Sequence, residues 1–460
     1  MMPFPAGGST LNTPLMDFIL SETARFLDAR PKTKALAERS GHVWRGGAPM
    51  HWMTDWATPI PIYAARAEGA KLWDVDGFEY DDFCLGDTPS MFGHARPEIA
   101  RAIAKQAQNG MGFMLPTETA VEVGELLTER FGLTKWQMAT TASDANRAAI
   151  RWARAITRRP KILIFDGCYH GMVDDAFVVL NDGTPVMKKG LIGQVADFTD
   201  TTTVIPFNDL DALEDALKYC DIACVLCEPV MTNCGMIAPI DGFHEALRTL
   251  TRKYGTLLAI DETHTLSSGY GGYTRSHGLE PDMFVVGKAI AGGVPAAVWG
   301  VTEEIAARMD QAQAAIGSGS SGIGTTLSGN ALAMSAMKVM LTEVMTEATF
   351  ADMTKGAENL VTQLRAVIAE QGLNWSVVHV GARVELVFGN LAPKNASQMR
   401  KLIDPLWLKA LHLFLINEGV LIAPFHNMML VSPFTSPDAC TRLGAAISAF
   451  GERVTRYGLT

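Results

Sequence analysis

One lysine in the sequence lies where a reactive amine is expected. Lys288 follows the apolar run Met283–Val286 and Gly287, and the glycine pair Gly292 and Gly293 comes shortly after it. A lysine amine shielded from water is a good nucleophile toward a carbonyl group, and glycine lets a ligand approach the backbone closely. The segment indicates an amine nucleophile, with an ordinary surface lysine at a strand end as the alternative.

An acidic pair follows a second apolar run. Leu257–Ile260 has the composition of a buried strand, and Asp261 and Glu262 come directly after it. The carboxyl end of a buried strand is the edge of the sheet at which α/β enzymes keep their sites. A carboxylate there can keep a ring nitrogen protonated. A helix-capping role for Asp261 is the alternative.

A group of small and hydroxyl-bearing residues opens a predicted helix. Thr141, Ala142 and Ser143 follow the apolar run Gln137–Thr140, and helical periodicity continues to Ile156. A helix start presents unpaired N–H groups and the positive end of the helix dipole, so it can seat an anion such as a phosphate. Serine and threonine at this position also serve as plain N-caps.

The three segments follow one another as phosphate seat, acid and amine, each at the end of a predicted strand. A phosphate, a basic ring nitrogen and an aldehyde that condenses with an amine are combined in pyridoxal 5′-phosphate (PLP). The sequence therefore predicts a PLP enzyme in which Lys288 holds the cofactor as a Schiff base and Asp261 holds its ring nitrogen.

These residues need a sheet to position them. Short apolar runs, separated by segments of helical periodicity, occur at Gln137–Thr140, Lys161–Phe165, Ala223–Cys227, Leu257–Ile260, Met283–Val286 and Ala296–Trp299. Apolar runs without alternation indicate strands that are buried on both faces. The pattern predicts an α/β fold with a mostly parallel sheet flanked by helices.

The length of 460 residues predicts more than one domain. We expect an N-terminal segment, 1–70, that packs on the small domain and the active site and contains helical pieces around Asp17–Ala37. A large PLP-binding domain, 71–345, and a small α+β domain, 346–460, should follow.

Several local signals refine this division. Strand signals at Pro61–Ala65 and Lys71–Val75 precede a hairpin turn at Asp76-Gly77. The glycine-rich Gly317–Gly324 is predicted to be a functional loop, since it runs straight into a patterned helix, Leu327–Glu343. In the last domain, strands are expected at Ser376–Val380, Val384–Phe388 and Met429–Val431.

Composition restricts the class of function. The 48% hydrophobic and 19% charged residues favour a folded globular protein, and a net charge of −10 argues against nucleic acid as a partner. Residues 1–8 lack the pattern of a signal peptide, and no apolar run approaches the ~20 residues of a membrane span. We expect a cytoplasmic protein with no nucleic-acid or membrane partner.

The seven cysteines fit a reducing compartment. Cys220, Cys224, Cys227 and Cys234 are close enough in sequence to suggest a zinc site. However, Cys224 and Cys227 lie in an apolar strand, whose alternation points residues three apart to opposite faces. Buried thiols are the favoured interpretation, and no metal is predicted.

Over most of its length, from about Ile62 onward, the sequence resembles the class III (fold type I) PLP-dependent aminotransferases. The nearest branches are those of the glutamate-1-semialdehyde aminomutase-like enzymes and the β-amino-acid transaminases. The resemblance rests on Glu68–Gly77, Tyr169-His-Gly171, Cys227-Glu-Pro229, Asp261-Glu262, Gly287-Lys288 with Gly292-Gly293, and Gly324–Asn330.

The resemblance implies how the cofactor is held. Tyr169 would stack on one face of the ring and Thr263 would pack against the other. Glu228 would order the site beside Asp261, and His170 would have a structural role.

It also implies a shared site. Ala142 and Ser143 match the family's phosphate cup, together with the Thr141 hydroxyl. Thr326 would reach the phosphate of the neighbouring subunit, which predicts a homodimer with shared active sites.

The sequence departs from the β-amino-acid transaminases at the substrate. Where those enzymes carry two carboxylate-binding arginines, this chain has His51 and Phe425 or His426. Arg383 could grip a carboxylate with its guanidinium fork, or could instead pair with Glu385. Trp56 could line the substrate pocket or pack beneath the N-terminal segment. The predicted substrate contacts are His51, Trp56, Arg383 and His426.

The resemblance implies an aminotransferase that moves an amino group from an amine or amino acid to a keto acid or other carbonyl acceptor. An aminomutase of the glutamate-1-semialdehyde type, or a racemase, is the alternative on the same scaffold. A cofactor-binding protein without catalysis is disfavoured, because such a protein needs neither Lys288 nor Asp261.

Overall fold

The computed structural model describes residues 13–319 and 321–456, so the predicted absence of a signal peptide at residues 1–8 lies outside the described part. The chain divides into two compact units. The small unit comprises the described parts of 1–96, 352–392 and 400–460, and the large unit comprises 97–351 and 393–399. The predicted domain limits at residues 70 and 345 remain a proposal, and the compact units divide the chain at other residues.

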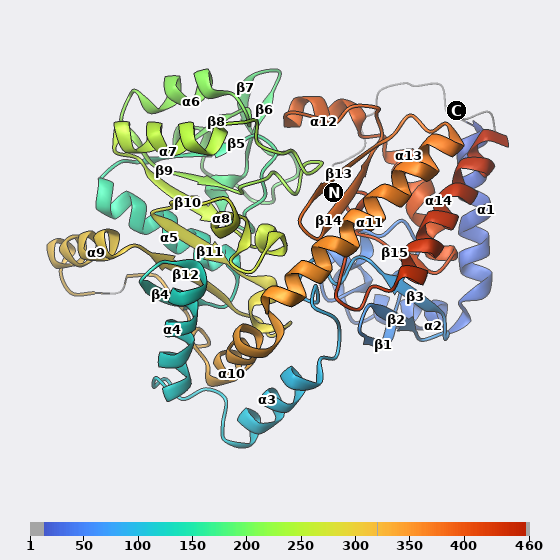
Figure 1. The fold of residues 1–460 in the computed structure, drawn as a ribbon, viewed down its shortest axis with the longest axis horizontal. Helices are drawn as coiled ribbons and strands as arrows, with labels where there is room; N and C mark the ends of the chain where they lie inside the picture. Colours follow the sequence, from blue (N-terminus) through green and yellow to red (C-terminus); the bar gives the residue numbers. More distant parts are fainter. Residues whose placement is uncertain (1–12, 320, 457–460) are drawn as a thin grey trace. The chain divides into compact units, whose positions relative to one another are not determined.

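The large unit is built on a seven-stranded sheet (Figure 1). Its strand order is β4-β12-β11-β10-β9-β5-β8. The strands are β4 (Lys135–Ala139), β5 (Lys161–Phe165), β8 (Thr202–Ile205), β9 (Ile222–Cys227), β10 (Leu257–Asp261), β11 (Met283–Val286) and β12 (Ala297–Val301). Only β12 runs against its neighbours β11 and β4, which confirms the mostly parallel α/β sheet.

Helices cover both faces of this sheet. In β5, Ile162 and Ile164 belong to the core on the side of α5 (Ala142–Thr157), whereas Leu163 and Phe165 belong to the core on the side of α6 and α7. Figure 1 shows α6 (Leu210–Leu217) and α7 (Phe243–Tyr254) lying together next to these strands. Burial on both faces explains the unbroken apolar runs of the sequence.

The cysteines follow the same geometry. Cys224 lies in the core on the α5 side and Cys227 in the core on the α7 side. Both are buried and carry free thiols. The part of the chain that the structure describes contains no group of three or more side chains that could hold a metal ion.

The remaining elements of the large unit surround the sheet. They are α3 (Pro97–Gln108), α4 (Glu118–Phe131), the hairpin β6 (Val178–Asn181) and β7 (Thr184–Met187), α8 (Gly272–Ser276), α9 (Glu303–Ile316) and α10 (Ala331–Val339). The helix predicted from Leu327 begins only at Ala331, because Gly329 has a φ of 73° and the Asn330 side chain caps the first turn. The helix then changes to a π turn at Met340–Val344.

The small unit packs its helices around two small sheets. One sheet has the order β1-β2-β3-β15 and the other β13-β14-β16. The strands are β1 (Ala64–Glu68), β2 (Lys71–Asp74), β3 (Glu79–Asp82), β13 (Ser376–Val380), β14 (Arg383–Val387), β15 (Val420–Leu421) and β16 (Met428–Leu430). The helices are α1 (Thr13–Ala29), α2 (Pro31–Gly41), α11 (Glu347–Gln371), α12 (Ala396–Leu402), α13 (Pro405–Asn417) and α14 (Pro437–Arg456). Residues 347–351 of α11 and 396–399 of α12 belong to the large unit.

The local predictions for this unit had mixed outcomes. The helical pieces expected around Asp17–Ala37 are present as two helices, α1 and α2, which are separated at Arg30 because Pro31 starts a new helix. The strand expected at Pro61–Ala65 lies at Ala64–Glu68. The hairpin turn after β2 is present, and its second strand, β3, was not predicted.

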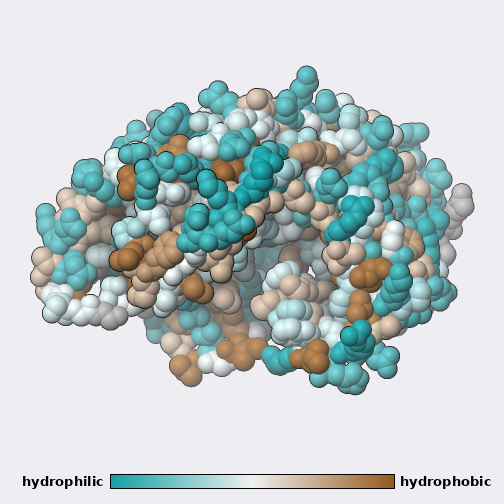
Figure 2. Space-filling view, turned by 90° about the horizontal axis from the view of Figure 1, so that it is seen from below, coloured by the Kyte–Doolittle hydropathy of each residue, from teal (hydrophilic) through white to brown (hydrophobic). Residues whose placement is uncertain are grey.

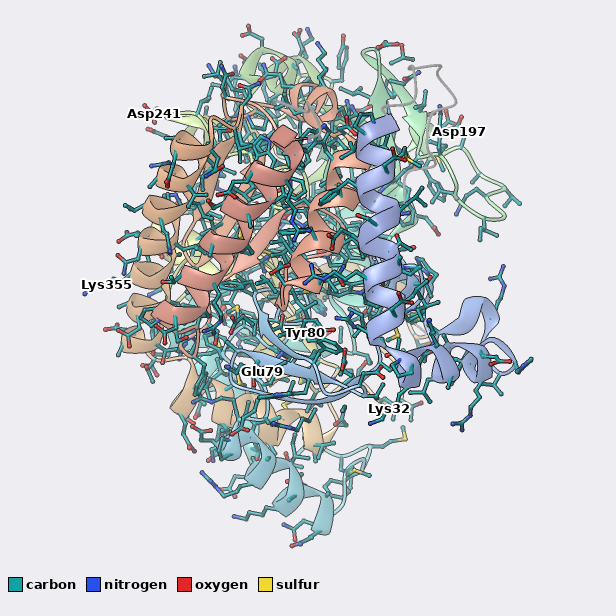
Figure 3. All side chains as sticks on the ribbon, turned by 90° about the vertical axis from the view of Figure 1, so that its right-hand side faces the viewer. Lys32, Glu79, Tyr80, Asp197, Asp241 and Lys355 are labelled. Carbon is teal, nitrogen blue, oxygen red and sulfur yellow. The ribbon has the colours of Figure 1, made fainter. Side chains whose placement is uncertain are left out.

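Neighbouring residues of β3 have opposite surroundings (Figure 3). Tyr80 is fully buried, and its hydroxyl donates to Asp74 at 2.7 Å and accepts from Arg30 at 2.8 Å. Glu79 is exposed and pairs with Lys71. The first two residues of β3 therefore include one polar residue of the surface and one of the core.

The surface seen in Figure 2 is mostly hydrophilic, with smaller hydrophobic groups between. Among the residues that the structure describes, no helix combines the length and the apolar character needed to cross a bilayer.

Candidate functional site

Lys288 lies in a tight turn at the carboxyl end of β11. Its own φ is 49°, in the left-handed region. A Cβ on Gly287 would lie 2.9 Å from the Cβ of Ala142, so glycine is needed where this turn passes the start of α5. The partly buried Lys288 amine lies 2.5 Å from Nε2 of His264.

Two further side chains extend this contact into the protein. Nδ1 of His264 lies 2.9 Å from Oγ1 of Thr232. The Thr232 hydroxyl is hydrogen-bonded to Oε2 of Glu228, which also accepts from the Thr232 backbone N–H at 3.2 Å. We call Lys288, His264, Thr232 and Glu228 the lysine network.

Asp261, at the end of β10, has a different set of partners. Its Oδ2 accepts from Nδ2 of Asn146 at 2.8 Å and lies 3.0 Å from Nδ1 of His170, and its Oδ1 accepts from the Thr263 backbone N–H at 3.0 Å. Burial by itself raises the pKa of Asp261, but His170 and the other donors lower this pKa to about 2. We call Asp261, Asn146, His170 and Thr263 the aspartate network.

His170 is affected in turn by its neighbours. Burial alone lowers the pKa of His170, yet Cys168 and the Asp261 carboxylate raise it well above its usual value. The pair therefore favours an ionised Asp261 next to a protonated imidazole. An acid of this kind is suited to keep a cofactor ring nitrogen protonated.

The first turn of α5 has the features of an anion seat. Thr141 is the N-cap residue, and its hydroxyl accepts from the Asp144 N–H at 3.2 Å. Ala142 and Ser143 form the start of the helix, and the Ser143 hydroxyl accepts from the Met172 N–H at 2.9 Å. Thr141 therefore acts as an N-cap, as the alternative interpretation of this segment expected. A helix start of this kind still offers backbone N–H groups that can bind an anion.

Two further observations fit a planar ring near Asp261. Tyr169, next to His170, is 46% exposed although it is a large aromatic residue. The buried hydroxyl of Thr263 has no hydrogen-bond partner among the described residues. A ligand that covers both side chains would remove the exposed ring and the unpaired hydroxyl, so the residues present fit PLP.

Glu228 and Thr326 lie in different surroundings. Glu228 is buried directly after β9, and the register of β9 with β10 brings it beside Asp261. Thr326 is exposed in the segment between α9 and α10.

The four predicted substrate contacts belong to the small unit. The guanidinium of Arg383 is buried and donates to the Thr88 hydroxyl and to Sδ of Met428 at 3.5 Å. Oε1 of Glu385 lies 3.0 Å from Nδ1 of His426. Burial lowers the pKa of His426, but Glu385 outweighs burial and raises it.

The other two predicted contacts are near the N-terminus. His51 is exposed in a short 3₁₀ helix, His51–Thr54. Trp56 is partly buried and packs against the core of the small unit, as the alternative interpretation of this residue expected.

Sequence reasoning missed His264, Thr232 and Asn146. His264 belongs to the same short stretch as Asp261, so its position after β10 was a usable signal. Thr232 and Asn146 carried no such signal, because their partners lie 32 and 115 residues away in the sequence.

Comparisons with known proteins agree on one family. The family model of class-III aminotransferases matches residues 52–445. The glutamate-1-semialdehyde 2,1-aminomutase of Thermodesulfovibrio yellowstonii is 33% identical over 79% of this chain and 85% of its own length.

Solved structures are similar over nearly the whole chain. A glutamate-1-semialdehyde-aminomutase from Pseudomonas aeruginosa PAO1 is 42% identical, with a TM-score of 0.93, over 96% of this chain and 99% of its own. A lysine-to-alanine variant of that protein has been solved in complex with PMP. An omega-transaminase from Sphaerobacter thermophilus is 29% identical, with a TM-score of 0.83, over 92% of this chain and 98% of its own.

Proposed function

The chain belongs to the class-III aminotransferase family and is a PLP-dependent enzyme of fold type I, and from this premise we propose that it is an aminomutase. It would move an amino group between neighbouring carbons of a small amino-aldehyde of the glutamate-1-semialdehyde type. The observation that carries this proposal is the 42% identity to a glutamate-1-semialdehyde-aminomutase over 96% of the chain. Transfer to a separate acceptor was the first expectation from the sequence, and the relatives support the alternative, an aminomutase, better.

The residues of the large unit have complementary roles in this proposal. Bound PLP withdraws electrons from the carbon that carries the amino group, which makes the proton on that carbon labile. Lys288 would hold the cofactor through Nζ and, once displaced by substrate, would take and return that proton as general base and acid. Asp261 would hold the ring nitrogen, and its ionised state at neutral pH keeps the nitrogen protonated.

The other predicted contacts would orient the cofactor and the substrate. The start of α5, with Thr141, Ala142 and Ser143, would bind the phosphate, and Tyr169 and Thr263 would enclose the ring. Aromatic stacking of this kind contributes about 1 kcal/mol. Glu228 would act through the lysine network rather than on the ring. Arg383, His426 and His51 of the small unit remain proposed substrate contacts, and Trp56, which packs against the core of that unit, would support them.

We also propose that the active protein is a homodimer in which Thr326 serves the neighbouring subunit. Thr326 is exposed, and Leu327 beside it has an exposed apolar side chain. This segment is tied to a second apolar segment by the bond from Ala331 N–H to Met111 O at 2.8 Å, and Met114 is 85% exposed. A second copy of the chain would cover these side chains. Sedimentation of the purified protein at the mass of a monomer would contradict this arrangement.

The isomerisation is tested with substrate labelled with ¹⁵N at its amino group. PLP-loaded protein should convert glutamate-1-semialdehyde into the isomer with the amino group on carbon 1, with no acceptor present and over many turnovers, as followed by mass spectrometry and NMR. The Lys288→Ala variant should form no isomer.

Two other outcomes would replace the proposal. Transfer of ¹⁵N to added pyruvate or 2-oxoglutarate, without isomer formation, would make the protein an aminotransferase, in line with its structural similarity to an omega-transaminase. Inversion at the amino-bearing carbon without movement of the amino group would make it a racemase.

A further inference from the structure

A continuous line of side chains connects the Lys288 amine to a buried carboxylate. Nζ of Lys288 lies 2.5 Å from Nε2 of His264, and Nδ1 of the same ring lies 2.9 Å from Oγ1 of Thr232, which is hydrogen-bonded to Oε2 of Glu228. The three residues beyond the lysine are almost inaccessible: His264 is 6%, Thr232 1% and Glu228 3% exposed. Water therefore has little access to the middle of the line.

Glu228 is poorly suited to remain charged. Its second oxygen, Oε1, is buried without a hydrogen-bond partner among the described residues. Burial raises the pKa of Glu228, and this effect outweighs the opposing influence of protonated His170 and of the Thr232 donors, while ionised Asp261 raises the pKa further. An ionised carboxylate in this position is costly, and taking up a proton removes the cost.

Each link between Glu228 and Lys288 can pass a proton. An imidazole can accept a proton at one ring nitrogen and release one from the other, and a hydroxyl can donate and accept at the same oxygen. The Asn233 amide also approaches Nδ1 of His264, but at 3.4 Å, which is longer than the contact of Nδ1 with Thr232. An amide N–H does not release its proton under these conditions, so the conducting contact is that with Thr232.

We propose that His264 and Thr232 form a proton relay that carries one proton from the Lys288 ammonium to the Glu228 carboxylate and returns it. In the forward direction an N–H bond of Lys288 breaks as one forms at Nε2 of His264. The Nδ1–H proton of His264 moves to Oγ1 of Thr232, and the Thr232 hydroxyl proton moves to Oε2 of Glu228. The electron count of each group is unchanged, and two opposite charges become two neutral groups. The inference rests on the proposed role of Lys288.

The relay would supply the lysine in the form that its proposed role requires. Only a neutral amine can attack a carbonyl carbon or accept a proton from substrate, and lysine in water near pH 7 is almost entirely charged. His264, Thr232 and Glu228 act through Lys288, so they are positioning residues.

The relay is tested by the chemical reactivity of Lys288 in the full-length protein. The protein is loaded with pyridoxamine 5′-phosphate (PMP), the amine form of the cofactor, which makes no Schiff base with Lys288. A trace acylating reagent competes for all lysines, and peptide mass spectrometry gives the labelling rate of Lys288 relative to Lys355. Lys355 is exposed on α11 and serves as the internal reference (Figure 3). The comparison is made across a range of pH.

Thr232→Val removes the bridging hydroxyl without touching Lys288. We expect it to slow labelling of Lys288 at pH 7 by roughly tenfold, and we expect the loss to disappear at the alkaline pH at which free lysine is neutral. Thr232→Ser keeps the hydroxyl and should restore the wild-type rate. His264→Gln, which retains hydrogen bonding but cannot pass a proton from one side to the other, should show the same loss as Thr232→Val.

The matched control is Thr265→Val. Thr265 is also buried and donates to a buried carboxylate, Glu262, at 2.5 Å, and it is not a member of the lysine network. Its loss should leave Lys288 labelling unchanged. The relay is refuted if Lys288 is labelled at the wild-type rate in Thr232→Val and His264→Gln. It is also refuted if labelling in Thr232→Ser, or in the control Thr265→Val, is as slow as in Thr232→Val.

The same measurement separates the relay from the role on which it rests. If Lys288 holds the cofactor, PLP-loaded protein should protect it from the reagent whereas PMP-loaded protein does not. Absence of protection would overturn the proposed role of Lys288, whatever the rates in the relay variants.

Discussion

Asp261 and Glu228 are neighbouring buried carboxylates with opposite protonation preferences. They follow the parallel strands β10 and β9, whose register pairs Ile260 with Cys227, the residues that precede the two acids. Burial raises the pKa of both, but that of Asp261 is lowered to about 2 and that of Glu228 remains raised.

The difference lies in the partners. Asp261 is contacted through both oxygens by Asn146, Thr263 and the protonated ring of His170. Glu228 uses one oxygen for Thr232 and leaves the other without a partner among the described residues. Two carboxylates with similar burial on one edge of a sheet therefore differ: Asp261 favours the ionised form, whereas Glu228 favours taking up a proton. The number and charge of the hydrogen-bond donors decide which form is favoured.

The largest expected effect comes from removing the Asp261 carboxylate. Asp261→Ala should lower kcat of the proposed isomerisation by roughly 10²–10³, the usual consequence of losing one electrostatic stabiliser. Steady-state kinetics of PLP-saturated protein measures it. Asp241→Ala, at an exposed aspartate of the large unit (Figure 3), should leave kcat unchanged. Near-normal turnover of Asp261→Ala would remove the proposed role.

An intermediate effect is expected from one of the donors to that anion. Asn146→Ala removes a hydrogen bond to a charged group, which contributes about 1.5–3 kcal/mol. In denaturant unfolding at neutral pH, Asn146→Ala should lower the free energy of unfolding by this amount in the wild-type background and by less in the Asp261→Ala background. Equal losses in the two backgrounds would mean that Asn146 does not act through Asp261.

The smallest expected effect is on folding stability, whose dependence on pH should have opposite signs for the two carboxylates. Glu228 has a raised pKa when folded, so wild type is relatively most stable below the usual value of 4.5 and loses stability as pH rises through the folded pKa. Glu228→Gln cannot ionise, so its stability relative to wild type should increase with pH, by about 1.4 kcal/mol for each unit by which the pKa is raised.

Asp261→Asn should behave in the opposite way. The lowered pKa of Asp261 stabilises wild type above the usual value of 3.8, and this advantage is lost as pH falls toward about 2. Unfolding of both variants at several pH values would test the pair. Slopes of the same sign would contradict the contrast between the two acids.

Much of the candidate site was readable from local sequence. Lys288, Asp261 and the start of α5 each follow an apolar run that became a strand of the large sheet. Parallel strands bring their carboxyl ends to one edge, so correct strand assignments were enough to place these residues on a common side. The helix predicted from Leu327 is present but begins four residues later, because the pattern of apolar residues did not reveal the cap at Asn330.

The lysine network shows what local sequence could not determine. His264 was visible in the stretch after β10, but nothing in that stretch says that its ring meets Lys288 on one side and Thr232 on the other. In the same way, local sequence did not show that Arg383 donates to the Thr88 hydroxyl and that Glu385 contacts His426, because Thr88 and His426 come from distant parts of the chain.

The sequence by itself determined most strands of the large sheet, the chemistry at the strand ends and the family, because these depend on periodicity and on residues a few positions apart. Only the tertiary structure decided which carboxylate is ionised and which can take up a proton. Burial and the number of hydrogen-bond donors are set by side chains that meet only after the sheet has formed.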